Sequence, residues 1–200
     1  MEKLDVLSPE FIIDRELSWL DFNTRVLELA EDTSIPLLER VRFLAIFSSN
    51  LDDFFMIRVA ATKLKIESGA SAPNASGLTP VALLEEITQK VSELIKRKVE
   101  CLHNSIKPGL VKADIHMVHW NELTQAERSY VGEIFDSQIF PVLTPLAVDP
   151  SHPFPYISGL SLSLAVIVKH PESGEEFFAR VKVPSVIARF ISTQKSIKTR

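Results

Sequence analysis

The sequence contains a single cysteine, Cys101, so no disulfide can form within the chain. A chain without disulfides is typical of the reducing cytosol. Cys101 stands among Val99, Leu102 and Ile106 in a pattern of helical spacing. Buried structural thiols are commoner than reactive ones in such surroundings, so we expect an inert core cysteine rather than a nucleophile.

Glycine is also scarce, at six of the 200 residues. Neither G-x-G-x-x-G nor G-x-x-x-x-G-K occurs, which excludes the two familiar glycine-rich phosphate loops. Positive charge is not in excess either, because the formal net charge is −4. A weakly acidic chain has little capacity to neutralise phosphates along a duplex, so we expect no nucleic-acid partner.

Long apolar runs are missing as well. No stretch approaches the roughly 18 apolar residues that read as a membrane span, so we expect no transmembrane segment. The opening MEKLDVLSPEF lacks the long apolar region that a signal peptide places after its basic start. These absences predict a cytoplasmic location and leave peripheral association with a membrane open.

What the first half does contain is helical periodicity. Ser18 and Asp21 form a weak capping box before one apolar stripe. Thr79, followed by proline, is typical of the N-cap of a second, long amphipathic helix that we expect to end at Pro108-Gly109. Apolar side chains hold one face of this long helix: Leu83, Leu84, Ile87, Val91, Leu94, Ile95, Leu102 and Ile106.

The second half has mixed patterns. DIHMVHW, residues 114–120, resembles a short strand. Thr124 and Glu127 form a capping box that predicts a helix reaching about Phe135. Five prolines between Phe140 and Gly159 predict an extended connection without regular structure, because proline removes backbone donors.

A β-hairpin is predicted near the end of the chain. LSLSLAVIV, residues 160–168, and FFARVKV, residues 177–183, are separated by a turn-forming segment. The predicted class is therefore α+β: an all-helical domain over residues 1–107, then a partial α/β head domain over 108–200. We expect the second domain to be incomplete, since a two-stranded hairpin is marginal alone.

One polar stretch interrupts the helical half, within IFSSNLDDFFMIR, residues 46–58. We expect a break between two helices there, with Ser49, Asn50 or both capping the second. The Asn50 amide also offers both a carbonyl and an N–H₂ group, which suits the polar edge of a heterocycle. Capping and ligand contact therefore both remain open for Asn50. Asp52 and Asp53 would point about 100° apart on a helix, which favours a solvated or capping pair over metal binding.

His116 and His119 form an H-x-x-H pattern that could suggest a metal site. On a strand, side chains three apart face opposite sides, so the two rings could not easily share one ion. The sequence nearby offers no cysteine or third histidine to complete a zinc set. We therefore expect no metal site in this chain.

Basic side chains cluster in several places along the helices. We expect two of these groups, Arg40 with Arg42 and residues 96–98, to lie on solvated helix faces, which is the ordinary position for basic residues. Arg58, Lys63 and Lys65 follow the polar stretch by a few helical turns. Whether these three face a polyanion is left open.

Three long blocks of the chain resemble bacterial polyphosphate kinases. They are spread along most of the chain: RELSWLDFNTRVLELAED (Arg15–Asp32), PLLERVRFLAIFSSNLDDFFMIRVA (Pro36–Ala60) and FPVLTPLAVDPSHPFPYISGLSLSLAV (Phe140–Val166). The resemblance implies an enzyme that reversibly transfers the terminal phosphate of ATP to inorganic polyphosphate. It also implies magnesium as cofactor and a phosphorylated histidine as intermediate.

The resemblance further implies a helical N-terminal domain, a head domain used in dimerisation and two C-terminal domains. The catalytic histidine, the magnesium-binding residues and most ATP contacts belong to that C-terminal part in the family. None of the five histidines here would then be catalytic, and the chain alone would be inactive. The implied partners are ATP or ADP, polyphosphate, and a second copy in a homodimer or larger homo-oligomer.

One site residue carries over from the family. The N-terminal domain contacts ATP through the asparagine that precedes Leu-Asp, and SSNLDDFF places Asn50 at that position. The alternative is a stand-alone helical interaction module without catalytic activity. A reading frame that continues past Arg200 into a histidine-bearing domain would favour the kinase.

Overall fold

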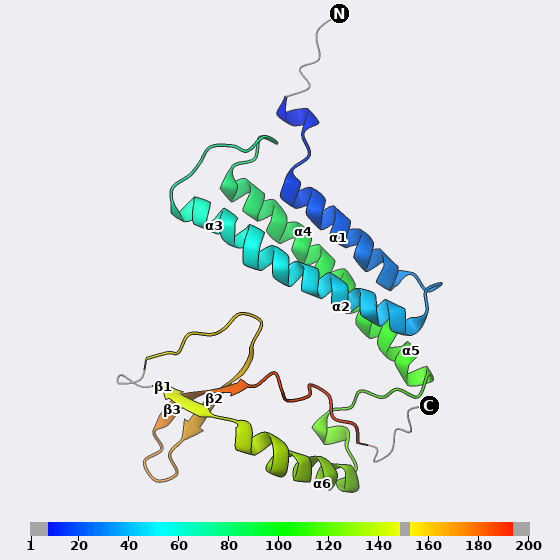
Figure 1. The fold of residues 1–200 in the computed structure, drawn as a ribbon, viewed down its shortest axis with the longest axis vertical. Coiled ribbons are helices and arrows are strands. Elements are labelled where there is room, and N and C mark those ends of the chain that lie inside the picture. The colour runs from blue at the N-terminus through cyan, green and yellow to red at the C-terminus, as the bar shows by residue number, and fades with distance from the viewer. Residues whose placement is uncertain (1–7, 149–152, 194–200) are drawn as a thin grey trace, which may run out of the picture. The chain divides into compact units, whose positions relative to one another are not determined.

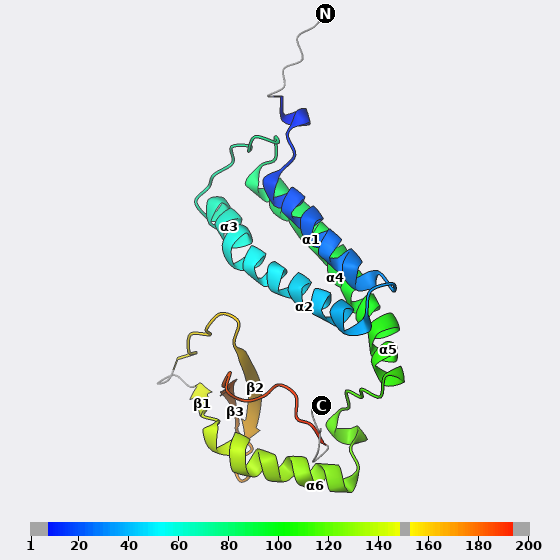
Figure 2. The same ribbon diagram turned by 45° about the vertical axis from the view of Figure 1, so that its right-hand side comes forward.

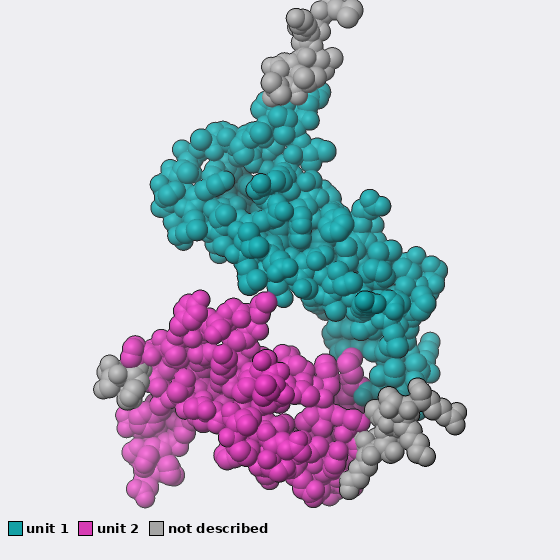
Figure 3. Space-filling model, viewed as in Figure 1, with its two compact units in different colours: residues 1–116 teal, residues 117–200 magenta. Residues whose placement is uncertain are grey.

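The computed structural model describes residues 8–148 and 153–193. The chain divides into two compact units, residues 1–116 and 117–200 (Figure 3). The first unit is helical, and the second contains an antiparallel sheet, as Figures 1 and 2 show. The predicted α+β class is confirmed.

Packed helices make up the first unit. Helix α1 packs against α2 and α4, and α3 packs against α4. The bounds are α1 Arg15–Glu31, α2 Leu37–Phe54, α3 Ala60–Glu67, α4 Pro80–Cys101 and α5 Lys107–Lys112, with π-helical turns at Phe55–Val59 and Leu102–Ile106 and a 3₁₀ turn at Pro9–Phe11.

Helix α1 begins at an aspartate rather than at the predicted serine. The Asp14 carboxylate accepts hydrogen bonds from the backbone N–H groups of Glu16 (2.8 Å) and Leu17 (3.0 Å). Ser18 lies inside the first turn, where its Oγ donates to Arg15 O over 3.0 Å. The predicted Ser18 capping box is therefore wrong, because Asp14 already satisfies the free N–H groups one turn earlier.

Helix α2 does not break at the polar stretch. It runs from Leu37 to Phe54 and continues through a π-helical turn into α3, so the predicted cap at Asn50 is wrong. Asp52 and Asp53 lie on its exposed side, and neither proline nor glycine interrupts residues 37–54. A buried residue every three or four positions holds the helix against the core: Arg40, Leu44, Phe47, Leu51 and Phe54.

Thr79 caps α4 as predicted, and its side chain accepts a backbone N–H over 3.2 Å. The helix does not stop at Pro108-Gly109, however, but passes through a π-helical turn into α5 and ends at Lys112. The wider turn changes the hydrogen-bond register just before Pro108, so its missing donor is tolerated. Gly109 serves packing instead of termination, because a Cβ there would lie 2.9 Å from Leu37 Cδ1.

One continuous core runs through the first unit. Burying a large apolar side chain stabilises the fold by roughly 1.5–3 kcal/mol relative to leaving it exposed. Asn23 is a polar member of the set of large side chains that are less than 2% exposed: Phe47, Phe54, Leu20, Leu27, Ile87, Ile106 and Asn23.

The second unit holds a sheet of order β1-β3-β2, with strands β1 Pro145–Val148, β2 Leu162–Lys169 and β3 Glu176–Val183. Strands β2 and β3 form the predicted hairpin, in a register that pairs Leu162 with Val183. Strand β1 pairs antiparallel with β3, within the segment predicted to lack regular structure. That prediction is wrong there, because Pro145 is the first residue of an edge strand, where a missing donor is tolerated.

Helix α6, Gln125–Ile134, precedes the sheet and begins at the predicted capping box. Thr124 N donates to Glu127 Oε2 over 2.8 Å, and Glu127 N donates to Thr124 Oγ1 over 3.3 Å. The strand predicted over residues 114–120 is wrong, since 115–119 pair with no strand in the part of the chain that the structure describes. Short turns complete the unit: 3₁₀ at Trp120–Glu122 and Phe140–Val142, and π at Phe135–Ile139.

Candidate functional site

Asn50 is the residue that the sequence analysis singles out, and it lies near the end of α2, one turn before the π-helical turn. Its Nδ2 donates to Asn23 Oδ1 over 2.9 Å, and Asn23 Nδ2 donates to Phe47 O over 3.2 Å. Asn23 comes from α1 and is fully buried, whereas Asn50 is partly exposed. The two side chains, called the asparagine pair below, therefore join α1 to α2 through a chain of hydrogen bonds.

An aromatic stack lies one turn further along α2. The rings of Trp19 and Phe54 are parallel to within 11°, with centroids 4.7 Å apart. The Arg58 guanidinium lies over the Trp19 ring at 5.9 Å from its centroid, at the distance of a cation–π contact. Arg58 belongs to the π-helical turn that follows α2, and such turns are frequent at functional sites.

Arg58 is held from its other side by Glu16, which is buried. Arg58 Nη1 lies 2.8 Å from Glu16 Oε2, and Arg15 Nη2 lies 2.5 Å from Glu16 Oε1. Burial raises the pKa of the Glu16 carboxyl, but the hydrogen bonds from Arg58 and Arg15 outweigh it and hold the pKa below its ordinary value. Glu16 therefore stays ionised at neutral pH and fixes the guanidinium of Arg58.

The same end of the unit ties down the loop before α4. Asn74 Nδ2 donates to Asp14 Oδ2 over 2.7 Å, and Ser76 Oγ donates to the same oxygen over 3.2 Å. Asp14 thus caps α1 with one carboxylate oxygen and holds the loop with the other. This part of the loop is therefore anchored to the start of α1.

The three basic residues that follow the polar stretch do not behave alike. Arg58 is engaged by Glu16 and Trp19, whereas Lys63 and Lys65 are exposed on α3. Arg40, predicted to lie on a solvated face, is instead buried: its Nε donates to Ala30 O over 2.7 Å and its Nη2 to Ser105 Oγ over 2.7 Å. That prediction is wrong because the carbonyls at the end of α1 need donors that only a neighbouring helix supplies.

Metal ligands do not converge in the described part of the chain. No group of three His, Cys, Asp or Glu side chains there could hold a metal ion. Asp52 and Asp53 are exposed neighbours on one helix, and His116 and His119 lie in a segment without regular secondary structure. The described residues therefore do not fit a resident magnesium site. His152 lies outside the described residues.

Cys101 lies in the core, as predicted. Its Sγ donates to Ala30 O over 3.4 Å, and burial raises the pKa of the thiol. A protonated, buried thiol is a poor nucleophile.

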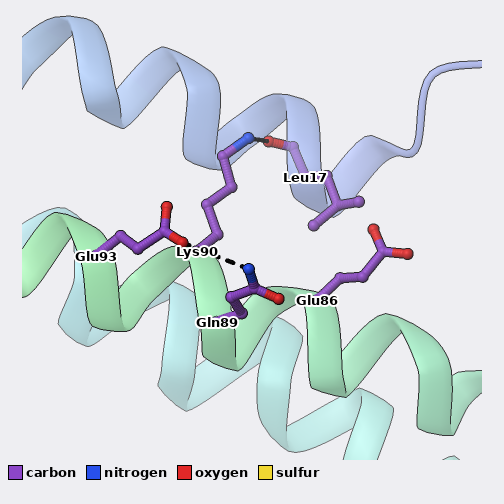
Figure 4. Close-up of a pocket in the computed structure, with 5 residues that line it drawn as sticks. All are labelled: Leu17, Glu86, Gln89, Lys90 and Glu93. Carbon is purple, nitrogen blue, oxygen red and sulfur yellow. Dashed lines mark hydrogen bonds between the residues drawn. The ribbon is translucent and has the colours of Figure 1, made fainter.

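An open pocket of about 410 Å³ lies where α1 meets α4 (Figure 4). Neither member of the asparagine pair lines it. Lys90 Nζ donates to Asp21 Oδ1 over 2.5 Å and to Leu17 O over 3.5 Å, so its charge is already neutralised. Acidic side chains contribute to the wall, which is unfavourable for a phosphate: the lining is Leu17, Glu86, Gln89, Lys90 and Glu93.

Protein-family models match both units of this chain. The polyphosphate kinase N-terminal domain matches residues 12–118, and the polyphosphate kinase middle domain matches residues 126–200. The chain belongs to the polyphosphate kinase family. The resemblance stated from the three sequence blocks is thereby confirmed.

Individual polyphosphate kinases are similar over most of this chain. The enzyme of Streptomyces coelicolor is 56% identical over 179 residues, which are 90% of this chain and 24% of the relative. That of Mycobacterium tuberculosis H37Rv is 53% identical over 187 residues, 94% of this chain and 25% of the relative. The chain thus spans about a quarter of the length of the curated relatives it matches.

A solved polyphosphate kinase has the same fold. The crystal structure of the enzyme from Porphyromonas gingivalis matches with a TM-score of 0.68 and 28% identity, covering 86% of this chain and 25% of that one. None of the described helices has the length and apolar character needed to cross a bilayer.

Sequence reasoning found Asn50 but missed its partner. Asn23 follows Leu20 and precedes Leu27 and Ala30 at intervals of three or four residues, on the buried stripe of α1. A polar residue on an apolar stripe was the available signal. Its partner could not be assigned from the sequence, because Asn50 lies 27 positions away on another helix.

Proposed function

We propose that this chain is the nucleotide-contacting and dimer-forming front part of a polyphosphate kinase. The complete enzyme would reversibly transfer the terminal phosphate of ATP to inorganic polyphosphate through a phosphohistidine. Magnesium and the reactive histidine would be supplied by residues outside this chain. The observation that carries the proposal is Asn50, a partly exposed amide at the position of the family's nucleotide contact.

The surroundings of Asn50 support a contact role. The residue stands at the edge of the buried face of α2, and Asn23 holds its side chain in place. A binding group on a rigid element loses little freedom when a ligand binds, so more of the contact energy appears as affinity. An exposed amide without such support would be a weaker candidate.

The second unit supports the proposed assembly. Apolar side chains on one face of its sheet are exposed: Leu164 (50%) and Val168 (49%) on β2, and Phe177 (39%), which pairs with Val168, on β3. Grouped exposed apolar side chains mark surfaces that other protein covers. We propose that a second copy of the enzyme and the rest of the same polypeptide share this role.

The kinetic test uses a full-length polyphosphate kinase that carries this segment. Asn50→Ala is expected to raise the KM for ATP by roughly tenfold, the effect of losing one or two polar contacts. The KM for polyphosphate in the reverse reaction should not change, because that substrate has no base. Asn104→Ala, an exposed asparagine of the same unit, is the matched control. Equal changes in both KM values would indicate structural damage and refute the contact.

The chain alone is expected to make no polyphosphate. Phosphoryl transfer needs an acceptor in line with the γ-phosphate and metal and basic groups around it, and the described residues bring no such set together. The assay is ATP-dependent synthesis with the 200-residue chain. Chain growth, or a phosphohistidine on this segment, would contradict the proposal.

A further inference from the structure

The asparagine pair has an order of donors and acceptors that chemistry fixes. Phe47 O is a carbonyl and can only accept, so Asn23 must direct its N–H₂ group toward it. Asn23 Oδ1 is then left for Asn50, which must present its own N–H₂ group. A rotation of either amide by half a turn would face oxygen with oxygen or nitrogen with nitrogen. The orientation of Asn50 is therefore set by a carbonyl of its own helix, acting through Asn23.

The consequence is that Asn50 presents its carbonyl. No hydrogen bond among the described residues engages Asn50 Oδ1, and it is not among the buried polar atoms that lack a partner. The oxygen is thus not sealed off from solvent, and it lies next to one remaining N–H. An amide that is free to rotate would offer either group with equal ease, whereas this one is held in one orientation.

We propose that Asn23 is a positioning residue that selects the base of the nucleotide through Asn50. This inference rests on the proposed contact between Asn50 and the nucleotide. Held this way, Asn50 can accept a hydrogen bond from the N6 amine of adenine and donate one to N7, whereas hypoxanthine and guanine present two acceptors, O6 and N7, on the same edge. Asn23 touches no ligand itself, because it is fully buried.

The cost of burying Asn23 agrees with such a role. A buried amide contributes little net stability even when it is hydrogen-bonded, and a leucine has the same branched arrangement of side-chain heavy atoms. Leu20 and Leu27 occupy the neighbouring positions of the same stripe. A polar residue at this place fixes an orientation that a leucine could not.

The first measurement needs no variant. ATP and inosine triphosphate differ at position 6, where an amine is replaced by a carbonyl with a proton on the adjacent ring nitrogen. In a full-length polyphosphate kinase that carries this segment, kcat/KM for ATP should exceed that for inosine triphosphate by roughly tenfold or more. Purine riboside triphosphate, which has neither group, should fall between them. Equal use of ATP and inosine triphosphate would overturn the proposal.

Two variants of Asn23 then separate positioning from stability. Asn23→Leu leaves Asn50 free to rotate, so the preference for ATP over inosine triphosphate should fall by roughly fivefold. Asn23→Asp keeps an acceptor for Asn50 Nδ2 and should retain the preference, although a buried carboxyl lowers the melting temperature more than leucine does. A purely structural role predicts the same nucleotide preference in both variants and in the wild type, and that result would refute the proposal.

A double variant distinguishes this inference from the proposed function. When Asn23→Leu is added to Asn50→Ala, it should cause no further change in nucleotide preference, because the side chain that Asn23 positions is gone. If Asn50→Ala itself leaves ATP use unchanged, the proposed contact fails and the inference fails with it. If Asn50→Ala weakens ATP use but Asn23→Leu leaves the preference intact, only the positioning role is wrong.

Discussion

The two units of this chain differ in how far their apolar side chains are buried. In residues 1–116 the apolar faces of the helices meet in one core, with Phe47 and Leu27 fully buried. In residues 117–200 the described buried side chains are Ala179 and Arg180, while Ile167 is 62% exposed. The first unit is stabilised from within, and the second offers apolar surface that other protein could cover.

Separating the units should produce the largest contrast. Residues 1–116 alone are expected to unfold cooperatively on heating with a strong helical circular dichroism signal, because the core lies within them. Residues 117–200 alone should show a broad, non-cooperative transition, because a small sheet with few buried side chains is marginal. The fragment should end after His116 rather than near Lys107, since Leu110 on α5 is buried. A cooperative transition in the second fragment would remove the contrast.

A matched pair of phenylalanines sharpens the comparison. Phe47→Ala in the first unit should cost about 3–5 kcal/mol, because it leaves a cavity in a packed core. Phe177→Ala in the second unit should cost at most about 1 kcal/mol, since that ring is already 39% exposed. Denaturant unfolding of the 200-residue chain measures both. Similar losses at the two positions would mean that the units are stabilised alike.

The acid sensitivity of the first unit should depend on Glu16. The pKa of its carboxyl is lowered in the folded state. Its contribution to the free energy of unfolding is therefore fully present above the unfolded pKa of about 4.3, and is lost as pH falls through the folded pKa. Glu16→Gln should cost about 1–2 kcal/mol at pH 6, and the gap from wild type should narrow toward pH 3. Urea unfolding of residues 1–116 at both pH values tests this. A gap that does not depend on pH would exclude the ion pair as its cause.

The parts of the fold that could be predicted from the sequence are those with local causes. Thr79 and the Thr124–Glu127 box are recognisable because a cap needs only a side chain near the free N–H groups of the next few residues. The hairpin of β2 and β3 follows from alternation and a short turn. These predictions are confirmed.

Two of the wrong predictions concern residues whose partners lie far away in the sequence. Gly109 looked like a helix end, but it allows α5 to approach Leu37 closely, a contact between segments far apart in the chain. Arg40 looked solvated, but its donors bond Ala30 O and Ser105 Oγ on other segments. One sequence without an alignment does not reveal such partners.

Asn50 has one feature that the sequence revealed and one that depends on a distant segment. Its polar character was visible, and the family resemblance gave it a role, but the reasoning placed it at a helix break that does not exist. Helix α2 continues because the buried stripe from Leu44 to Phe54 keeps its spacing through the polar residues. The residue is therefore held by Asn23 rather than by a cap. That arrangement supports a contact role more strongly than a cap would, because capping no longer competes for the side chain.

The most direct test of the central claim compares two ligands that share their phosphates. ATP and inorganic tripolyphosphate are titrated by calorimetry into a full-length polyphosphate kinase that carries this segment, as wild type and as Asn50→Ala. If Asn50 contacts the base, the Kd for ATP should rise roughly tenfold in the variant, while the Kd for tripolyphosphate should stay within twofold of wild type. An unchanged ATP affinity, or an equal loss for both ligands, would contradict the account.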